Sequence, residues 1–351
     1  MTEERLRELL AQLKNLNIVV VGDLFLDRWW EVNNDLDEPS VETGITAYQI
    51  TGRRFSAGAA GTVINNLAAL GVGRVGCVSM LGQDGEGYEV LKCLKAIHAD
   101  TSHIVRSARI MTPTYTKPMF RHRTPEGISP ETEGHRFDIK NHSYTPQDLL
   151  AKMIGYLKEE AAHADAIIAL DQLTDINTGV ITYEMRQALS DLSAQYPGLL
   201  IYADSRAFLS LFENVVVKCN DSEAWQLFHS EAYPGFDETL LSDCLTRLHE
   251  RSGKPSLITC GAKGILVEDP EHPGQARLVP AIPVTGPIDI VGCGDACSAG
   301  LVSAWAAGAS MTEAAEMGNL TASVTIKKIG TTGTASPEEV LHQYQAHTDH
   351  L

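Results

Sequence analysis

Two glycines and an aspartate near the C-terminal end of the chain have the spacing of an anion-binding turn followed by a carboxylate. Gly292 and Gly294 flank Cys293, and Asp295 comes directly before a helix-like run. Glycines let the backbone turn tightly, so that successive N–H groups point into one concavity beside the positive end of the helix. Phosphoryl transfer to a hydroxyl needs such donors for the phosphoryl oxygens and a base for the hydroxyl. The same segment also fits an aspartate that caps a helix after a Gly-rich turn.

Two more polar side chains follow another strand-like run. Asn220 and Glu223 come soon after the apolar stretch 215–218. An amide and a carboxylate at a strand end suit a hydrated Mg²⁺, which prefers oxygen ligands. The same spacing is typical of a capping box at a helix N-terminus, and that structural role is compatible with metal binding.

Two aspartates, Asp23 and Asp27, follow the β-branched run 18–21. Open α/β sheets bind ligands beyond the carboxyl ends of their strands, which is where both aspartates are expected. A carboxylate accepts charge-assisted hydrogen bonds from paired hydroxyls, and this is the usual chemistry of polyol recognition. The alternative for either aspartate is a turn or a cap.

Strand-like and helix-like segments alternate along most of the chain and must position these residues. Short runs of β-branched and apolar residues are typical of strands that are buried on both faces. Their alternation with helices predicts an α/β fold with three layers, α/β/α, around a mostly parallel central sheet. The predicted strands are 18–21, 75–79, 166–170, 199–203, 215–218 and 257–259, and the predicted helices include 58–70, 86–97, 295–308 and 311–327.

Two stretches break this rhythm. Residues 28–56 and 104–142 are rich in turn residues and in short alternating runs such as 45–51, 114–120 and 135–139. Because both follow βα units of the predicted sheet, we expect them to form a small β lid over its carboxyl edge. The alternative is two ordinary surface insertions.

Charge and composition exclude several classes of function. A formal net charge of −17 repels phosphodiester backbones and anionic lipid, so neither nucleic acid nor membrane is an expected partner. The seven cysteines form no CxxC pair, which favours a reducing compartment. The N-terminus is acidic and amphipathic, unlike a signal peptide, and no apolar run reaches the roughly 20 residues that span a bilayer. We therefore expect a cytoplasmic protein with one domain, residues 1–351.

One glycine motif is misleading. Residues 71–76 match G-x-G-x-x-G, but they follow a helical run and lead into a strand. A dinucleotide fingerprint has the reverse order, so we interpret this segment as the end of a helix and a turn. The chain also has no G-x-x-x-x-G-K-[ST] phosphate loop.

The segment around Asp295 resembles the signature of the ribokinase-like (PfkB-type) carbohydrate kinases, which usually reads Asp-Thr-x-Gly-Ala-Gly-Asp. Here it reads Asp-Ile-Val-Gly-Cys-Gly-Asp, with the Gly-x-Gly-Asp core intact. The resemblance implies that Asp295 takes the proton from a sugar hydroxyl. It also implies that Gly292, Cys293 and Gly294 supply the amides of the anion hole.

Two further segments resemble the nucleotide half of this family. Residues 218–223 are similar to Lys-Pro-Asn-x-x-Glu, and residues 259–264 are similar to a Thr-x-Gly-x-x-Gly turn. The resemblance implies that ATP and Mg²⁺ are the cofactors, with Glu223 acting on the metal through water. The implied cofactor-binding residues are Asn220, Glu223, Thr259, Gly261, Gly264 and Asn319.

The N-terminal half also resembles the family, although with more departures. Residues 56–62 are similar to its Gly-Gly-x-x-Asn segment, but Thr62 stands where the family has an asparagine that binds sugar. Segments 171–175 and 203–206 replace turns of the type Asp-Tyr-x-Lys-Gly and Asp-Pro-Lys. Because these departures are confined to the acceptor side, the resemblance implies an unusual or unassigned substrate.

Within the family, the opening segment 22–30 and the segment 112–117 look most like bacterial heptose-7-phosphate kinases, the kinase domain of ADP-heptose synthases. Lid cations would then meet a sugar phosphate, because arginine forks bind phosphate with two hydrogen bonds. Alternatively, they are solvated charges that protect a sheet edge. The substrate-binding residues implied by the whole resemblance are Asp27, Asp23, Gly58, Thr62, Lys117, Arg123 and Arg136.

The expected activity is therefore ATP-dependent phosphorylation of a hydroxyl on a sugar or sugar phosphate, such as a heptose 7-phosphate. The alternatives are a kinase of nucleosides or other small alcohols on the same fold, and a non-catalytic member that binds nucleotide or sugar. A homodimer formed through the lid is a further expectation, because pairing would bury an exposed sheet face.

Overall fold

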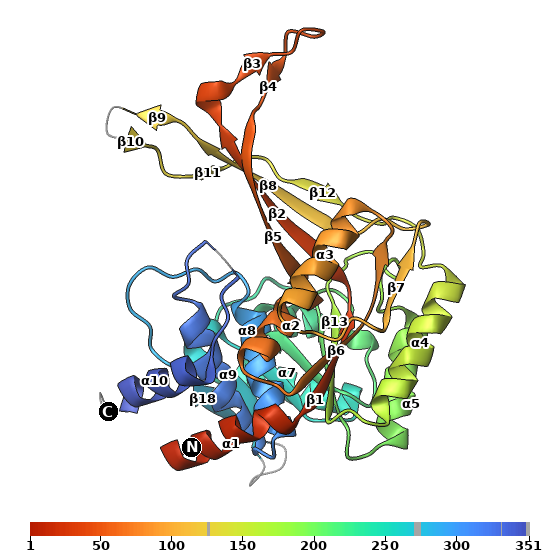
Figure 1. Ribbon diagram of the computed structural model, residues 1–351. Helices are drawn as coiled ribbons and strands as arrows, with labels where there is room; N and C mark the ends of the chain where they lie inside the picture. The colour runs from red at the N-terminus through yellow and green to blue at the C-terminus, as the bar shows by residue number, and fades with distance from the viewer. Residues whose placement is uncertain (125–126, 270–274, 331, 349–351) are drawn as a thin grey trace.

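The computed structural model describes residues 1–124, 127–269, 275–330 and 332–348. A large sheet lies between two layers of helices, and a second sheet projects from one edge of this body (Figure 1). The three-layer fold, the mostly parallel sheet and the small β lid expected from the sequence are therefore confirmed.

Within the described residues, the large sheet has nine strands. In spatial order they are β18 (Ala276–Pro280), β17 (Gly264–Glu268), β16 (Ser256–Thr259), β15 (Val216–Asn220), β14 (Leu200–Ser205), β13 (Ala166–Asp171), β1 (Asn17–Gly22), β6 (Arg74–Gly82) and β7 (Ile104–Ser107). The last seven of these strands run parallel to one another, and β17 and β18 add an antiparallel edge.

Strand β1 illustrates why these runs are continuously apolar. Ile18 and Val20 pack into the core on one face of the sheet, while Val19 and Val21 pack into the core on the other. All four side chains are fully buried, so both faces of the strand need apolar residues.

Helices cover both faces (Figure 1). One core contains residues of α1 (Glu3–Gln12), α2 (Ala60–Ala69), α3 (Gly85–Ala96), α8 (Cys293–Ala306), α9 (Met311–Thr325) and α10 (Pro337–Thr348). The opposite core contains residues of α4 (Gln147–Ala161), α5 (Tyr183–Gln195), α6 (Asp221–Phe228) and α7 (Glu238–Ser252). Short 3-10 turns lie at η1 (Leu13–Asn15), η2 (Asn34–Leu36), η3 (Leu209–Leu211) and η4 (Gly261–Lys263). Each helix in the described ranges is too short or too polar to span a bilayer.

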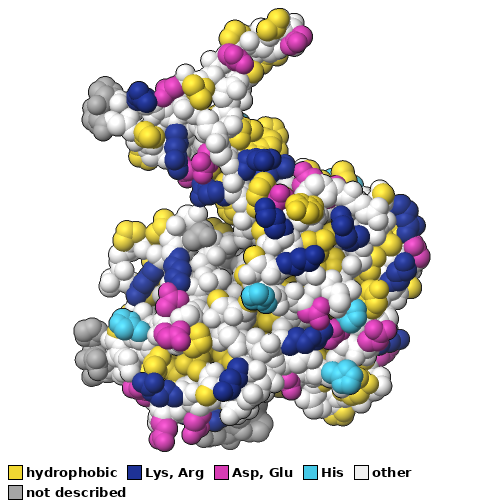
Figure 2. Space-filling view, viewed as in Figure 1, with side chains coloured by type: hydrophobic (Ala, Val, Ile, Leu, Met, Phe, Trp, Pro, Cys, Tyr) yellow, Lys and Arg dark blue, Asp and Glu magenta, His cyan; other side chains and the backbone are white. Residues whose placement is uncertain are grey.

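The lid is a separate twisted sheet in which β2 pairs with β5 antiparallel and with β8 parallel. Figure 2 shows it as a lobe that stands away from the body and carries apolar side chains and charges of both signs. Its strands are β2 (Leu24–Asn33), β5 (Ile50–Ala59), β8 (Thr114–Arg121), β11 (Thr132–Glu133) and β12 (Phe137–Ile139), with the small pairs β3 (Glu38–Pro39) and β4 (Thr46–Ala47), and β9 (Arg123–Thr124) and β10 (Gly127–Ile128).

The boundaries of the lid differ from the expected segments 28–56 and 104–142. Strand β7, at 104–107, pairs with β6 and extends the large sheet. Its residue Val105 is 7% exposed because it packs into the core beside α4. The second lid segment therefore begins at β8. The first is longer than expected, since β2 and β5 together reach from Leu24 to Ala59.

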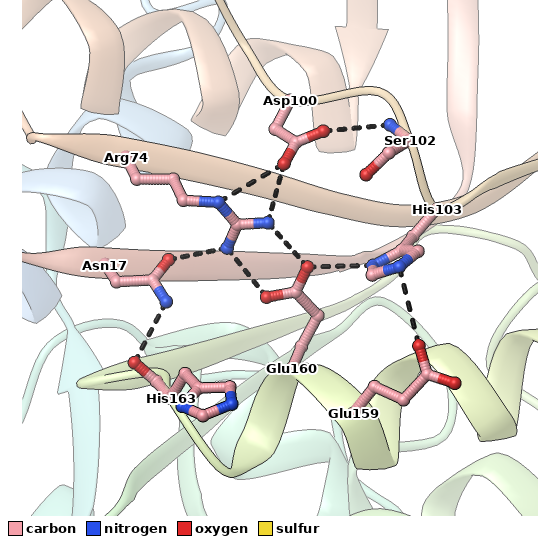
Figure 3. A network of polar contacts seen from close by, with 8 residues as sticks. All are labelled: Asn17, Arg74, Asp100, Ser102, His103, Glu159, Glu160 and His163. Atoms are coloured by element: carbon pink, nitrogen blue, oxygen red, sulfur yellow. Dashed lines mark hydrogen bonds and ion pairs between the residues drawn. The ribbon is translucent and has the colours of Figure 1, made fainter.

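An ion-pair network joins elements at the N-terminal ends of the strands (Figure 3). Arg74 binds both carboxylate oxygens of Glu160 at 2.6 and 2.7 Å, and it also binds Asp100 at 2.7 Å and Asn17 at 2.8 Å. His103 contacts the same Glu160 at 2.8 Å. The network ties β1, β6 and the loop before β7 to α4, at the sheet edge opposite the polar residues that follow the strands.

The interpretation of residues 71–76 as a turn is correct. Gly71 follows α2 with a φ of 82°, the left-handed conformation that favours glycine, and β6 begins at Arg74. This segment therefore has the helix-to-strand order that excludes a dinucleotide fingerprint.

Candidate active site

A cavity of about 620 Å³ lies between the lid and the carboxyl edge of the large sheet. Its walls come from β2, β5 and β8 of the lid, from the turn after β14 and from the segment that leads into α8. The predicted site residues that it brings together are Asp27, Thr62, Lys117, Arg136, Gly292 and Asp295.

The turn before α8 has the geometry expected of an anion hole. Gly292 is the N-cap of α8 with a φ of 79°, and Asp295 lies in the first turn of the helix. A Cβ on Gly292 would lie 3.4 to 3.5 Å from the methyl groups of Thr332 and Thr62, which is ordinary contact, so it is the left-handed conformation that favours glycine here. The N-terminal amides of α8 thus begin beside the carboxylate of Asp295, at the cavity wall.

Asp295 has the electrostatic environment of a general base. Its pKa is raised to about 7, mainly by burial and also by Asp204, while Lys218 and Arg206 oppose that rise. A carboxyl group with a pKa near neutrality accepts a proton readily and is still ionised in about half of the molecules near pH 7.

A buried ion pair lies beneath this turn. Lys218 Nζ donates to Asp204 Oδ2 at 2.7 Å, and a Cβ on Gly294 would lie 3.7 Å from that same Nζ. Burial opposes the charge on Lys218, but Asp204 and Tyr202 together outweigh burial, and the pKa of Lys218 is raised well above its usual value. Neither residue is among the site residues expected from the sequence. The sequence signal was only that Asp204 follows one predicted strand and Lys218 ends another, and the structure shows that the two pair in register across β14 and β15.

Asp27 lies on the lid wall, and Gly58 makes room for it. The two residues sit on the paired strands β2 and β5, and a Cβ on Gly58 would come within 2.3 Å of Asp27 Oδ2. Burial raises the pKa of Asp27, and Lys117 and Arg136 oppose that rise. Gly58 therefore leaves space for the Asp27 carboxylate.

Two predicted substrate residues lie elsewhere. Asp23 is 4% exposed and accepts a hydrogen bond from the Val180 amide at 2.9 Å, behind the cavity rather than in its wall. Burial raises its pKa to about 7. Arg123 lines a separate hollow on the outer part of the lid, together with Asp35 and Arg121. The structure does not bring either residue to Asp295.

The predicted nucleotide residues lie along the same sheet edge, beside this cavity. Asn220 ends β15 and pairs in register with Thr259, which ends β16. Asn220 and Glu223 form the capping box of α6 through two hydrogen bonds of 2.8 Å. Within the described part of the chain, the second carboxylate oxygen of Glu223 has no protein partner, which is compatible with contact to a hydrated cation.

The remaining residues of this group have structural roles that the sequence did not reveal. Gly261 and Gly264 have φ values of 53° and 119° and shape the turn between β16 and β17. A Cβ on Gly264 would meet the Val279 carbonyl oxygen at 2.0 Å. Asn319 donates to the carbonyls of Val279 and Pro280 at 3.1 and 3.0 Å and thereby fastens α9 to β18.

Aromatic and cationic side chains of the lid line the same cavity as the turn before α8. Phe25 and Tyr115 pack with ring centroids 4.9 Å apart, and Arg136 lies 4.2 Å from the centroid of Tyr115. Lys117 lies 5.6 Å from the centroid of Trp29. The cavity therefore combines apolar ring faces with cations, a lining that suits a small polar ligand carrying negative charge.

The mostly parallel α/β sheet, the β lid and the Gly-x-Gly-Asp helix start under that lid together make a ribokinase-like fold. Residues 203–339 match the model of the pfkB family carbohydrate kinases. This part of the chain, which contains Asn220, Glu223 and Asp295, is thus similar to the PfkB-type carbohydrate kinases, as the sequence resemblance implied.

Solved structures agree on the fold. The ribokinase of Arabidopsis thaliana complexed with ribose and ATP aligns over 93% of this chain and 98% of its own, with a TM-score of 0.68 and 17% identity. Phosphofructokinase-2 of Escherichia coli in complex with fructose-6-phosphate aligns over 95% and 99%, with a TM-score of 0.69 and 17% identity.

Curated proteins similar to the chain include the bifunctional proteins HldE of Sulfurimonas denitrificans and Magnetococcus marinus. They are 25% and 28% identical over 94% and 90% of this chain. The chain spans only 64% and 61% of their lengths.

Proposed function

We propose that this protein transfers the γ-phosphoryl group of ATP to a hydroxyl of a sugar or sugar phosphate. The observation that carries the proposal is Asp295, a carboxylate with a pKa raised to about 7, in the first turn of α8 and in the wall of the cavity that also contains Asp27. Asp295 accepts the proton of the attacking hydroxyl, and the amides of residues 292–294 stabilise charge on the transferred group. Asp27 accepts hydrogen bonds from acceptor hydroxyls and orients them.

The cofactors that we propose are ATP and Mg²⁺, held along the carboxyl ends of β15 and β16. Asn220, Glu223, Thr259 and the glycine turn 261–264 are the residues proposed to contact nucleotide phosphates and the hydrated metal. When bound, Mg²⁺ neutralises charge on the phosphate oxygens. The chain's own contribution is to present oxygen ligands at a strand end and to keep the cavity shielded by the lid.

For the acceptor, we propose a phosphorylated sugar of the heptose 7-phosphate kind. The motifs 22–30 and 112–117 support this choice, and so does the presence of Lys117 and Arg136 in the cavity wall. The absence of asparagine at Thr62 keeps a nucleoside or another small alcohol as the second candidate. A non-catalytic binding role is the third, and retention of both Asp295 and Glu223 argues against it.

We also propose a homodimer that forms through the lid. The lid exposes several large apolar side chains, and exposed apolar surface of this kind is typical of interaction sites. They are Leu36, Val41, Ile45, Tyr48, Ile50, Ile128 and Phe137. Sedimentation of the full chain, compared with a variant carrying Val41→Asp, measures the oligomeric state and its dependence on this surface.

The experiment that tests the activity is ADP release with MgATP against matched pairs of free and phosphorylated sugars, including D-glycero-D-manno-heptose and its 7-phosphate. Turnover with at least one sugar and its loss in Asp295→Asn are expected. Measurable ATP binding without turnover on any acceptor would move the assignment to another substrate class or to a binding role.

A further inference from the structure

Two of the cations in the cavity wall stand out because they lack a carboxylate partner. Arg54 pairs with Glu31 and Glu131, and Arg136 pairs with Asp138 through two hydrogen bonds. Across the described ranges, neither Lys117 nor Arg206 makes a side-chain hydrogen bond or an ion pair within the chain. Lys117 projects from the lid strand β8, and Arg206 projects from the turn after β14.

Arg206 is an exposed side chain in the wall of the cavity. Its charge acts on Asp295 at the anion hole, on Tyr115 of the lid and on Glu223 at the start of α6. An unpaired guanidinium in that position is available to a ligand, because no protein carboxylate in the described structure occupies its five donors. Guanidinium groups match the geometry of phosphate and carboxylate with two parallel hydrogen bonds.

The turn that carries Arg206 is held by a buried polar network. Asp171 and Arg186 are 3% and 4% exposed and form an ion pair of 2.7 Å. Ser205 donates to the same Asp171 oxygen at 2.9 Å, and the Arg206 amide donates to the Asp171 carbonyl at 3.0 Å. Ser205 Oγ also accepts from the Phe208 amide at 2.9 Å.

This network keeps the backbone of the turn in place while the Arg206 side chain stays exposed to the cavity. A binding group on a rigid support loses less entropy when it engages a ligand. Buried ion pairs by themselves add little to stability. The pair of Asp171 and Arg186 therefore serves mainly to position the turn that carries Arg206.

We infer that Arg206 binds an anionic phosphate group already present on the acceptor and thereby selects phosphorylated over free sugars, with Lys117 contributing from the lid. This inference rests on the proposed function for the identity of the acceptor. The inference adds Arg206 to the proposed acceptor site. Arg206 lies in the segment 203–206, which differs from the Asp-Pro-Lys turn of the family pattern.

A phosphate of the nucleotide is the other source of the same chemistry, since Arg206 also acts on Glu223. The acceptor is favoured because Arg206 lines the cavity that contains Asp27 and Lys117, whereas Asn220 and Thr259 are outside its wall. Binding measured separately for sugar and for nucleotide distinguishes the two sources.

The direct test is calorimetric titration of nucleotide-free protein with D-glycero-D-manno-heptose 7-phosphate, with fructose 6-phosphate and with the two free sugars. For a phosphosugar that binds, Arg206→Gln is expected to weaken binding about 10- to 100-fold and to change free-sugar binding less than about twofold. Arg206→Lys keeps the positive charge but loses the bidentate guanidinium, so its affinity for the phosphosugar should lie between those of the wild type and Arg206→Gln.

Arg106→Gln is the matched control, because Arg106 is an exposed arginine on β7 outside the cavity. Its binding constants should equal those of the wild type. Two results would overturn the inference. One is that neither phosphosugar binds the wild type more tightly than its free counterpart, and the other is that Arg206→Gln weakens ATP while sparing the phosphosugars.

Turnover with MgATP separates this inference from the proposed function. If phosphosugar binding depends on Arg206 but no acceptor causes ADP release, the anion site would stand and the kinase assignment would be wrong. Turnover on free sugars alone, unaffected by Arg206→Gln, would preserve the kinase assignment and overturn the anion site.

Discussion

The ammonium of Lys218 and the carboxylate of Asp204 form a 2.7 Å ion pair directly beneath the turn that precedes Asp295. Both side chains are largely buried, with exposed fractions of 8% and 14%. The pair acts on Asp295 with opposite signs, since Asp204 raises the pKa of Asp295 and Lys218 lowers it. Two elements that are distant from α8 in sequence thus tune the proposed base.

The first prediction concerns the pH dependence of activity. A base must be ionised, so kcat/KM should rise with pH through about 7 and level off above it. Asp204→Asn removes a negative neighbour, which favours the ionised form of Asp295 and should shift this limb to lower pH. Profiles of kcat/KM from pH 5 to 9 for both proteins measure the shift. An unchanged or higher midpoint in the variant would contradict the assignment.

The second prediction tests Asp295 itself. Asp295→Asn keeps the size of the side chain but removes the base, so kcat should fall by roughly 10²- to 10⁴-fold. ATP affinity should change little, because the proposed nucleotide residues lie at β15 and β16. Single-turnover rates and ATP titrations give the two quantities. A variant with wild-type kcat would show that another group accepts the proton.

A third prediction follows from the close approach of Gly58 to Asp27. In Gly58→Ala, the new methyl group would overlap the Asp27 carboxylate, which can rotate away because it is the end of a side chain. We expect a folded protein whose KM for the acceptor rises by about tenfold, because the displaced Asp27 carboxylate loses a charge-assisted hydrogen bond to the acceptor.

The matched control for that change is Gly155→Ala in α4, where an added Cβ would meet no atom within 4 Å. It should leave KM unchanged and stabilise the helix by about 0.5–1 kcal/mol. If both variants raise KM alike, the effect does not come from Asp27.

A fourth prediction separates stability from activity. Arg74→Met breaks the network in Figure 3 and leaves Glu160 buried without its guanidinium, which should cost on the order of 2–3 kcal/mol of unfolding free energy. Catalytic constants of the folded protein should not change, because the network lies at the opposite edge of the sheet. Urea unfolding and steady-state kinetics on the same samples provide both readings.

The same network has a defined pH signature. Arg74 lowers the pKa of Glu160. Burial tends to raise the pKa of Asp100, but hydrogen bonds from Ser102 and Arg74 lower it to about 2. A depressed carboxylate pKa contributes stability above the unfolded-state value of roughly 4, and this stability is lost as pH falls through the folded value. The stability gap between wild type and Arg74→Met should therefore narrow from pH 5 towards pH 2.

The fifth prediction compares two lid cations. Lys117 lines the cavity, and Arg123 lines another hollow. Lys117→Gln should raise KM for a phosphorylated acceptor several-fold more than Arg123→Gln does. Equal effects would mean that the lid closes far enough to bring Arg123 to the acceptor.

Much of the fold could be predicted because local patterns sufficed. Runs such as 18–21 are apolar at every position only when both faces of a strand are covered. These continuous runs, alternating with helical segments, indicated a sheet between two layers of helices. The lid boundary at 104–107 was wrong because a short strand at the edge of the large sheet has the same alternation as a lid strand.

The local backbone of the candidate site was predictable where its residues are contiguous in sequence. Residues 292–295 and 220–223 each lie within a single turn, so their spacing already determines the glycine turn before α8 and the capping box. Asp27 and Asp23 illustrate the limit. Both follow β1, yet Asp27 faces the cavity and Asp23 faces the buried Val180 amide, because the direction of a side chain depends on which strands pair.

The sequence by itself thus determined the helix start with its glycines, the proposed base and the order of strands and helices, since each depends on neighbouring residues. Only the tertiary structure decided that Asp204 and Lys218 sit under Asp295, that Arg206 faces the cavity and that Arg123 does not. Parallel strands that are distant in the chain bring their carboxyl ends to one edge, and the electrostatics of that edge arise from residues whose proximity no local pattern records.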